Sequence, residues 1–371
     1  MTPLRIFPVI LAGGASSRLW PASGKEKPKW DLRLFGTKDS CGKPQSLLES
    51  AWERARALAS AADCFVVGSA TSMALVRTSL PELLEENLLI EPEPRDTAAA
   101  VAFATGVILK RTKKVSGGVM LVLSGDQVIR PISQFVRCAQ IGAQAAVELN
   151  ALITFGIVPK KPMTQYGYIQ RGPMITLSTT FAPDSPKLYR LLQFREKPDR
   201  TTAEQYFKAG EYFWNGGIFL WTLDSVLKEF DRQLPAHATL ARAISDAPTI
   251  DPVLQQYFLS LKKTSIDFGI MEHAQNAAMV AADFEWDDIG SWSAIGEHLD
   301  RQLDNVVGPD TKLITVDARG NLIFAPGKRV SLIGVEGLAI IESDNEILVC
   351  RLERDQDVKK ASEEATRSLR E

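Results

Sequence analysis

The residues best suited to chemistry stand near the amino terminus, in the stretch VILAGGASSRLWPASGKEKPKW at positions 9–30. A short apolar run ends there in Gly13 and Gly14, and glycines let backbone N–H groups approach a ligand closely. Cations follow within a short span, at Arg18, Lys25, Lys27 and Lys29. A loop of this kind after a first strand lies where open α/β sheets bind ligands. The stretch therefore predicts a polyphosphate site, although the glycine pair alone fits a plain tight turn equally well.

The stretch matches neither common phosphate-binding fingerprint, because GxxxxGK[ST] is missing and GGASSR lacks the third glycine of GxGxxG. The composite pattern LAGGxxxRLWP, followed by Pro28-Lys29, resembles instead the signature of the sugar-1-phosphate nucleotidyltransferases. It is most similar to that of the mannose-1-phosphate guanylyltransferases, also called GDP-mannose pyrophosphorylases. The resemblance implies that Arg18 meets the triphosphate and Lys29 the α-phosphate in the transition state. It implies nucleotide binding by the residues before them: Leu11, Ala12, Gly13 and Gly14.

Size and composition are those of an ordinary globular protein, with 371 residues, 45% apolar and 24% charged. The net charge of −2 provides no global basic field for nucleic acid or anionic membranes. The 4 cysteines form no CxxC pair, which favours free thiols in a reducing compartment. No signal-peptide pattern and no apolar run of about 18 residues is present, so we expect a cytoplasmic protein without membrane contact.

The elements that must hold the loop alternate between strand and helix. Apolar runs predict buried strands at 6–11, 64–68, 88–90, 119–123 and 151–157. Ser46 and Glu49 form a capping box that predicts the start of a helix. With the resemblance, this order predicts an α/β fold: a nucleotidyltransferase domain over residues 1–300, built on a Rossmann-like, mixed, mostly parallel sheet.

The residue pattern of the sequence changes beyond residue 305, where short β runs alternate with Gly, Asp and Asn turns. This pattern predicts a small β domain with a polar helical tail over residues 301–371. The resemblance implies that this domain is left-handed β-helix-like and contributes to the contact of a homodimer.

Two carboxylates are candidates for a divalent cation. Asp126 follows the apolar run 119–123, and an acid at the end of a central parallel strand lies beside the phosphate loop. Mg²⁺ prefers one or two carboxylates together with phosphate oxygens. By itself, an Asp after a strand is more often a turn or capping residue. The resemblance implies that Asp126 and Asp288, the latter in WDDIGSW, bind Mg²⁺ together.

The resemblance also assigns a segment to the nucleotide base. In EPEPRDTAAA, residues Arg95, Asp96 and Thr97 would form part of the base pocket. Read without the family, the same segment indicates only the start of a well-packed, alanine-rich helix.

Three further segments would hold the sugar phosphate. They contribute Gly167 in QYGY, Glu196 and Lys197 in FREKP, and Asn215 in FWNGG. For Glu196 and Lys197 the alternative is an exposed charged turn. Asp267 is expected to be a structural capping residue.

Taken together, these features predict transfer of GMP from GTP to α-D-mannose 1-phosphate, giving GDP-mannose and pyrophosphate. The sugar phosphate would attack the α-phosphorus in line, so catalysis rests on positioning and charge neutralisation assisted by Mg²⁺. Several positions differ from the family pattern, namely Gly24, Trp30, Asp96 and Gln127. They leave open another nucleotide or hexose 1-phosphate, or a non-catalytic regulator that binds a nucleotide sugar. The retained Lys29, Asp126 and Asp288 favour the enzyme.

Overall fold

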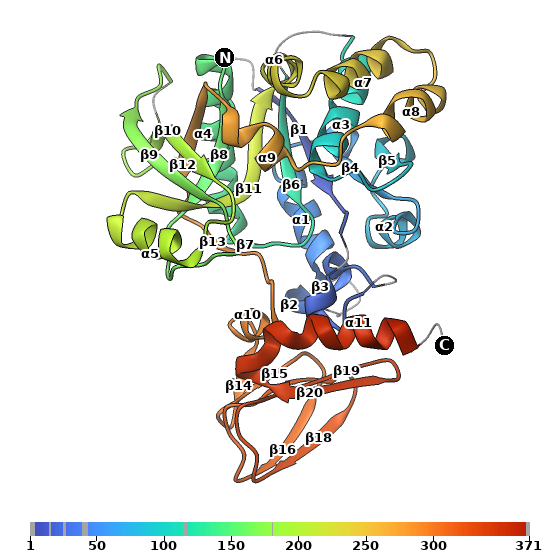
Figure 1. Ribbon diagram of the computed structural model, residues 1–371, viewed down its shortest axis with the longest axis vertical. Helices are drawn as coiled ribbons and strands as arrows, with labels where there is room; N and C mark the ends of the chain where they lie inside the picture. The colour runs from blue at the N-terminus through green and yellow to red at the C-terminus, as the bar shows by residue number, and fades with distance from the viewer. Residues whose placement is uncertain are drawn as a thin grey trace.

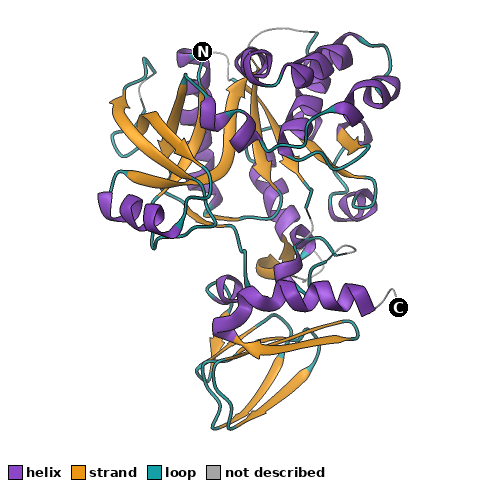
Figure 2. Ribbon diagram, viewed as in Figure 1, coloured by secondary structure: helices purple, strands orange, loops and turns teal. Residues whose placement is uncertain are grey.

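The computed structural model describes residues 4–14, 16–24, 27–38, 44–113, 118–179 and 181–368, with only the backbone for 35–38. A large α/β part and a smaller β part are stacked along the long axis (Figure 1). Helices flank the sheet of the large part, whereas the small part consists mainly of strands and one long helix (Figure 2). No helix of the described segments is both long and apolar enough to cross a membrane.

A nine-stranded sheet forms the centre of the large part. Its strand order is β5 (Leu88–Glu91), β4 (Phe65–Ser69), β1 (Arg5–Leu11), β6 (Gly118–Ser124), β11 (Tyr212–Thr222), β8 (Leu152–Ile157), β12 (Ala277–Ala281), β10 (Leu188–Arg195) and β9 (Tyr168–Ile175). All of these strands except β10 and β11 point the same way. The predicted mixed, mostly parallel α/β sheet is thus confirmed. Because β9 also pairs with the start of β11, this half of the sheet curls back on itself.

Helices cover both faces of the sheet because its strands are apolar on both sides. Along β1, Ile6 and Ile10 join a cluster with α1 (Leu47–Arg56) and α4 (Ile132–Leu149). Phe7 and Val9 face the other side. That side is covered by α3 (Thr97–Arg111), α6 (Leu223–Gln233) and α7 (Pro235–Asp246). Further helices of the large part are α2 (Met73–Ser79), α5 (Arg200–Ala209), α8 (Asp251–Tyr257) and α9 (Ile266–Gly269).

Two predictions from local sequence concern the helices α1 and α3. The capping box of α1 is confirmed, since Glu49 N donates to Ser46 Oγ at 3.1 Å and Ser46 N donates to Glu49 Oε2 at 2.6 Å. Helix α3 approaches α7 so closely that a Cβ on Gly106 would lie 2.7 Å from the Ala241 carbonyl oxygen. The alanine-rich sequence of α3 therefore serves close packing.

The small part is a coil of short strands. Its larger sheet contains β14 (Asp300–Gln302), β15 (Asn305–Val307), β17 (Leu322–Phe324), β19 (Leu338–Ser343) and β20 (Glu346–Arg351). A second sheet pairs β16 (Lys312–Val316) with β18 (Arg329–Ile333). Strands β15, β17 and β19 are parallel neighbours, and buried Asn321 donates Nδ2 to Asn305 Oδ1 at 2.9 Å between successive turns. The predicted β-helix-like domain is confirmed.

The two parts share a hydrophobic cluster. Leu19 from the first loop packs in it with Trp292 of α10 (Trp292–Gly296), Leu322 and Val358. Val358 begins α11 (Val358–Ser368), which follows the 3₁₀ turn η7 (Leu352–Asp357). Helix α11 crosses between the hairpin of β2 (Arg33–Lys38) and β3 (Pro44–Ser46) and the strands β19 and β20 (Figure 1). The end of the chain is thereby placed against the first loop.

Candidate active site

The glycine loop begins where β1 ends. Ala12 N donates to the Val67 carbonyl at 2.8 Å and Gly125 N donates to that of Leu11 at 3.0 Å, so β1 stays fixed in the sheet up to this point. A Cβ on Gly13 or Gly14 would meet no atom within 4 Å, and Gly14 has φ +90°. The loop thus presents bare backbone to open space, and only Gly14 needs glycine for its conformation.

Lys29 lies between two carboxylates. It begins the 3₁₀ turn η2 (Lys29–Asp31) and is only 6% exposed. Its Nζ lies 3.0 Å from Asp126 Oδ2 and 3.7 Å from Asp288 Oδ1, and donates to the backbone carbonyl of Asp288. The sequence-predicted Lys29, Asp126 and Asp288 are therefore brought into one cluster.

A short antiparallel ladder brings the two carboxylates together. Strand β7 (Val128–Arg130) pairs with β13 (Glu285–Asp287), and Val128 stands opposite Asp287. The turn that follows β13 is strained, because Ile289 adopts φ +47° although it is β-branched. Asp287 Oδ1 accepts from Ile289 N at 2.7 Å and Oδ2 lies 2.9 Å from His298 Nε2. This turn directs Asp288 toward Lys29, at a backbone cost of about 1–3 kcal/mol.

The charges of the cluster are strongly coupled. Burial alone would lower the pKa of Lys29, but the carboxylates of Asp126 and Asp288 outweigh it and raise that pKa. Burial likewise opposes ionisation of Asp126, yet the Lys29 ammonium and the Ser124 hydroxyl bring its pKa below the usual value. Asp288 has a raised pKa because burial and the charge of Asp126 exceed the attraction of Lys29. Lys29 thus remains a cation and Asp126 an anion at neutral pH.

A cavity of about 290 Å³ opens over this cluster. Its lining contains three cations and two carboxylates together with small polar residues: Gly14, Ser16, Ser17, Arg18, Lys29, Asp126, Asp288, Gly290 and Lys359. Arg18 Nη1 comes close to Gly290, within 3.8 Å of where a Cβ would stand. Among the predicted cations, Lys27 instead pairs with Asp344 and donates to Ser343 Oγ at 3.0 Å in the C-terminal domain. Lys25 lies outside the described residues.

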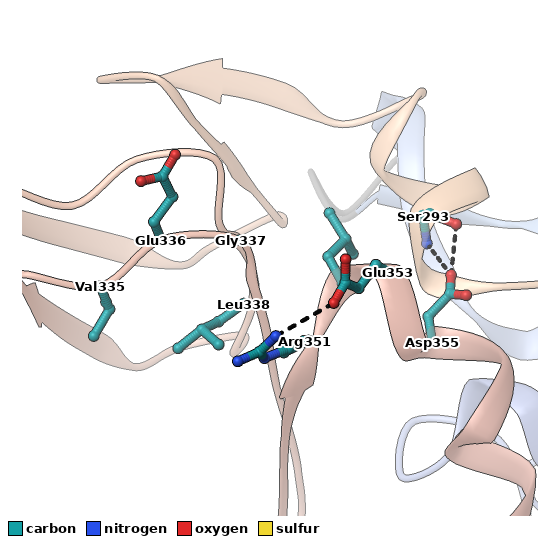
Figure 3. A pocket seen from close by; sticks show the side chains of 9 residues that line it. Ser293, Val335, Glu336, Gly337, Leu338, Arg351, Glu353 and Asp355 are labelled. Carbon is teal, nitrogen blue, oxygen red and sulfur yellow. Dashed lines mark hydrogen bonds and ion pairs between the residues drawn. The ribbon is translucent and has the colours of Figure 1, made fainter.

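A larger hollow, of about 730 Å³, lies on the C-terminal domain. Figure 3 shows Arg351 beside Glu353, at 3.5 Å, and Asp355 accepting from Ser293 N, at 2.8 Å. The remaining lining carboxylate, Glu336, pairs with Arg319 at 3.2 Å. The smaller cavity, by contrast, gathers the sequence-predicted Arg18, Lys29, Asp126 and Asp288 beside the glycine loop, so we place the candidate active site there.

The donor set of the smaller cavity fits a hard divalent cation. The described residues contain no group of three or more His, Cys, Asp or Glu side chains arranged to hold a metal ion. Asp126 and Asp288 offer two carboxylates, and the bare backbone of Gly14 leaves space for phosphate beside them. Mg²⁺ in nucleotide sites uses this combination of few carboxylates, water and phosphate oxygens.

The residues predicted for the sugar phosphate form a second cluster. Asn215 N donates to the Gly167 carbonyl at 2.8 Å, and its Nδ2 donates to Asp267 Oδ1 at 2.8 Å. Lys197 Nζ pairs with Glu196 Oε1 at 2.9 Å. A Cβ on Gly167 would lie 2.4 Å from Glu196 Oε2, so glycine at this position leaves room for the Glu196 carboxylate. Burial lowers the pKa of Lys197, but the negative charges of Glu196, Asp267 and Asp288 outweigh it and raise that pKa.

Asp267 differs from the sequence expectation. Ser265 caps α9 instead, since its Oγ accepts from Phe268 N at 3.2 Å, while the Asp267 side chain turns into the sugar cluster. Burial and the neighbouring Glu196 raise the pKa of Asp267 to about 7. Glu196 Oε2 is buried and has no hydrogen-bond partner in the described segments. These two carboxyl groups are suited to accept hydrogen bonds from sugar hydroxyls.

The predicted base segment lies apart from the cavity, at the end of β5. Asp96 caps α3 through its Oδ1, which accepts from Thr97 N at 2.8 Å, and the Thr97 hydroxyl accepts from Ile266 N at 2.8 Å. Arg95 donates to the Leu261 carbonyl at 3.3 Å. The Thr97 contact holds α3 against α9, and Asp96 adopts φ +68° where it caps α3.

Sequence reasoning missed Glu91, the last residue of β5. Its Oε1 is buried without a hydrogen-bond partner in the described part of the chain. Burial, and then the charge of Asp96, raise its pKa to about 7. The acidic residue at the end of an apolar strand was the available signal, by the same reasoning that selected Asp126.

Three of the departures from the family pattern, Gly24, Trp30 and Gln127, make structural hydrogen bonds. Trp30 is 1% exposed and donates Nε1 to the Ala12 carbonyl at 3.1 Å, which supports the loop from behind. Gln127 donates Nε2 to the Gly216 carbonyl at 3.0 Å, next to Asn215. Gly24 N donates to the Lys27 carbonyl at 2.8 Å, and a Cβ there would meet open space. None of these three residues is among those that line the cavity.

Residues 7–304 match the nucleotidyl transferase family. The chain belongs to this family. Residues 311–364 match the MannoseP isomerase/GMP-like beta-helix domain, which agrees with the coil seen in the small part. The chain is 36% identical over 365 residues to mannose-1-phosphate guanylyltransferase of Klebsiella pneumoniae and 35% identical to that of Escherichia coli, covering 96% of this chain and 73% of each relative.

A solved structure agrees with this membership. The chain superposes on the crystal structure of mannose-1-phosphate geranyltransferase from Thermus thermophilus with a TM-score of 0.83 and 29% identity, over 98% of this chain and all of the other. The resemblance to the mannose-1-phosphate guanylyltransferases and the prediction of a nucleotidyltransferase enzyme are confirmed.

Proposed function

We propose that this nucleotidyltransferase transfers GMP from GTP to α-D-mannose 1-phosphate, releasing pyrophosphate and GDP-mannose. The observation that carries the proposal is the cavity in which Arg18, Lys29, Asp126 and Asp288 meet beside the bare backbone of Gly14. The activity for which the two bacterial relatives are named supports the choice of substrates.

In this proposal the phosphates lie over the glycine loop. Arg18 binds the triphosphate, and Lys29 stabilises the charge that builds on the α-phosphate oxygens as the sugar phosphate attacks in line. The raised pKa of Lys29 keeps it protonated for this task. Mg²⁺ held by Asp126 and Asp288 would neutralise phosphate charge and help align the reacting oxygens. The attacking phosphate oxygen is already an anion, so the reaction needs no general base.

The nucleotide extends from the loop along the carboxyl edge of the sheet. Leu11, Ala12 and Gly13 present the backbone beneath it. Strand β5 is two strands away from β1, or about 10 Å at ordinary strand spacing, which leaves room for a ribose between phosphate and base. We assign Glu91 to the guanine base, whose N1–H and N2–H₂ groups can both donate to one carboxylate. Arg95, Asp96 and Thr97 position the start of α3 beside it.

The sugar phosphate occupies the second cluster. Glu196 and Asp267 accept hydrogen bonds from mannose hydroxyls, Asn215 orients Asp267, and Gly167 leaves space for the Glu196 carboxylate. Lys197 binds the sugar phosphate by exchanging its pairing with Glu196 for one with the phosphate. Because a buried polar group left without its partner is costly, this set discriminates between hexoses by their hydroxyls.

The reaction is tested by pyrophosphate release. Purified protein with Mg²⁺ is offered GTP, ATP, UTP or dTTP, each with mannose 1-phosphate or glucose 1-phosphate. We expect release with GTP and mannose 1-phosphate. Release with a different pair would overturn the specificity and keep the mechanism. If no pair releases pyrophosphate and the protein still binds a nucleotide sugar, a regulatory role would replace the proposed activity.

We also propose a cytoplasmic homodimer that meets through the C-terminal domain. Apolar side chains gather on the β16–β18 sheet, where Val316 and Ile333 are register partners with exposures of 51% and 72%, and Ile314 is 49% exposed. Covering them is worth about 25 cal/mol per Å² of apolar surface. Val316→Glu combined with Ile333→Glu should give a monomer in analytical ultracentrifugation, and an unchanged sedimentation coefficient would reject this face.

A further inference from the structure

Helix α11 forms part of the wall of the active-site cavity. Its first residue, Val358, is buried in the cluster that also contains Leu19 and Trp292. Leu19 belongs to η1 (Ser17–Leu19), the turn that carries Arg18. The next residue of the helix, Lys359, lines the same cavity as Arg18 and Lys29.

Several polar contacts fix the beginning of α11. Asp355, 4% exposed, accepts from Ser293 N at 2.8 Å, one residue beyond the start of α10. Gln165 Nε2 donates to Gln356 Oε1 at 3.2 Å, which links η7 to the segment before Gly167. Together with the burial of Val358, these contacts fix the backbone at the start of α11, so Lys359 is held beside the cavity.

The charge balance of the cavity calls for a further cation. Arg18 and Lys29 are offset by Asp126 and Asp288, so before any Mg²⁺ binds these four groups leave the lining neutral for a strongly anionic ligand. Lys359 makes the lining net positive. Its present partner, Glu363, lies 3.8 Å away, and both side chains are more than half exposed. Such a surface pair is weak, so the ammonium can turn to a phosphate at little cost.

We propose that Lys359 is a third phosphate-binding cation of the active site and contacts the part of the nucleotide that leaves as pyrophosphate. The proposal rests on the proposed function for the identity of the ligand. It gives the C-terminal domain a direct part in substrate binding.

The test compares Lys359→Met with Lys360→Met. Lys360 is the adjacent residue, 79% exposed and paired with Asp357 at 2.6 Å, so it matches the change in charge outside the cavity. Calorimetric titration with magnesium pyrophosphate measures binding without turnover. A charge-assisted hydrogen bond at a partly exposed site predicts about tenfold weaker binding for Lys359→Met. The KM for GTP should rise by a similar factor and that for mannose 1-phosphate should stay within about twofold.

Three results would overturn the proposal. They are pyrophosphate affinity of Lys359→Met within about twofold of wild type, an equal loss in Lys360→Met, and a loss confined to mannose 1-phosphate. Lys359→Arg should restore most of the affinity, which separates a charge effect from damage to α11. If wild type binds pyrophosphate but releases none from GTP and mannose 1-phosphate, the proposed substrates fail while the binding comparison still decides the role of Lys359. If wild type binds neither pyrophosphate nor GTP, both proposals fail.

Discussion

Lys29→Met removes the ammonium that separates Asp126 from Asp288 while keeping a side chain of similar length. Lys29 is 6% exposed and its Nζ lies 3.0 Å from Asp126 Oδ2. No other described side chain that lines the cavity stands at this position, so none supplies the lost positive charge there. If Lys29 stabilises charge at the α-phosphate, its loss should lower kcat by about 10²–10³-fold, as for the removal of one oxyanion donor. The KM values should change much less.

The variant should also lose stability. Breaking a buried ion pair by removing one partner costs about 3–5 kcal/mol. The Asp288 side chain is 40% exposed, so solvent screens part of this, and we expect a loss of about 2 kcal/mol near neutral pH. The protein should still fold, because the surrounding cluster and the sheet are unchanged.

The stability loss should depend on pH with a defined sign. In wild type the pKa of Asp126 is lowered, so its contribution to stability is present above its ordinary value of 3.8 and is lost in acid. In the variant, burial and mutual repulsion raise the pKa of both carboxyls, so they destabilise the protein at neutral pH and recover as they protonate. The difference in unfolding free energy between variant and wild type should therefore be smaller at about pH 5 than at about pH 7.5. Mg²⁺ should narrow it too, since a cation replaces the ammonium.

Steady-state pyrophosphate release and urea unfolding, each with and without Mg²⁺, measure both effects. Lys27→Met is the matched control, because Lys27 lies in the same loop but pairs with Asp344 outside the cavity. Turnover within about tenfold of wild type would refute the catalytic assignment. A stability gap that is the same at both pH values, or a variant that does not fold even with Mg²⁺, would refute the electrostatic reasoning.

Three further substitutions address the base, the sugar and acid stability. Glu91→Gln should raise the KM for GTP about tenfold and reduce the preference for GTP over ATP in competition assays, because it loses a charged acceptor. In wild type, the KM for mannose 1-phosphate should fall as the pH rises through about 7, where Asp267 ionises, and Asp267→Asn should abolish that dependence. His237 is 1% exposed, and burial lowers its pKa from 6.5 to about 4, so wild type should lose stability as the pH falls through this range. His237→Phe should remove about 3 kcal/mol of that loss, measured by urea unfolding at pH 7.5 and at low pH.

Local patterns predicted much of the architecture because they depend on neighbours in sequence. The strands ending at Leu11 and at Ser124 were recognisable from continuous apolar runs, and the capping box at Ser46 from its spacing. The change to short β runs beyond residue 305 likewise predicted the C-terminal coil. The cations of the first loop were selected by residue type and spacing, whereas the family resemblance selected Asp126 and Asp288 as a pair.

The sequence by itself therefore determined the fold class, the phosphate loop and the choice of Lys29, Asp126 and Asp288. The tertiary structure alone decided which groups meet. The β7–β13 ladder places Asp288 beside Asp126, Asp267 turns toward Asn215 instead of capping α9, and α11 brings Lys359 to the first loop. These contacts join segments far apart in the chain, and they depend on tertiary packing and on hydrogen bonds between those segments, which leave no local periodicity to read.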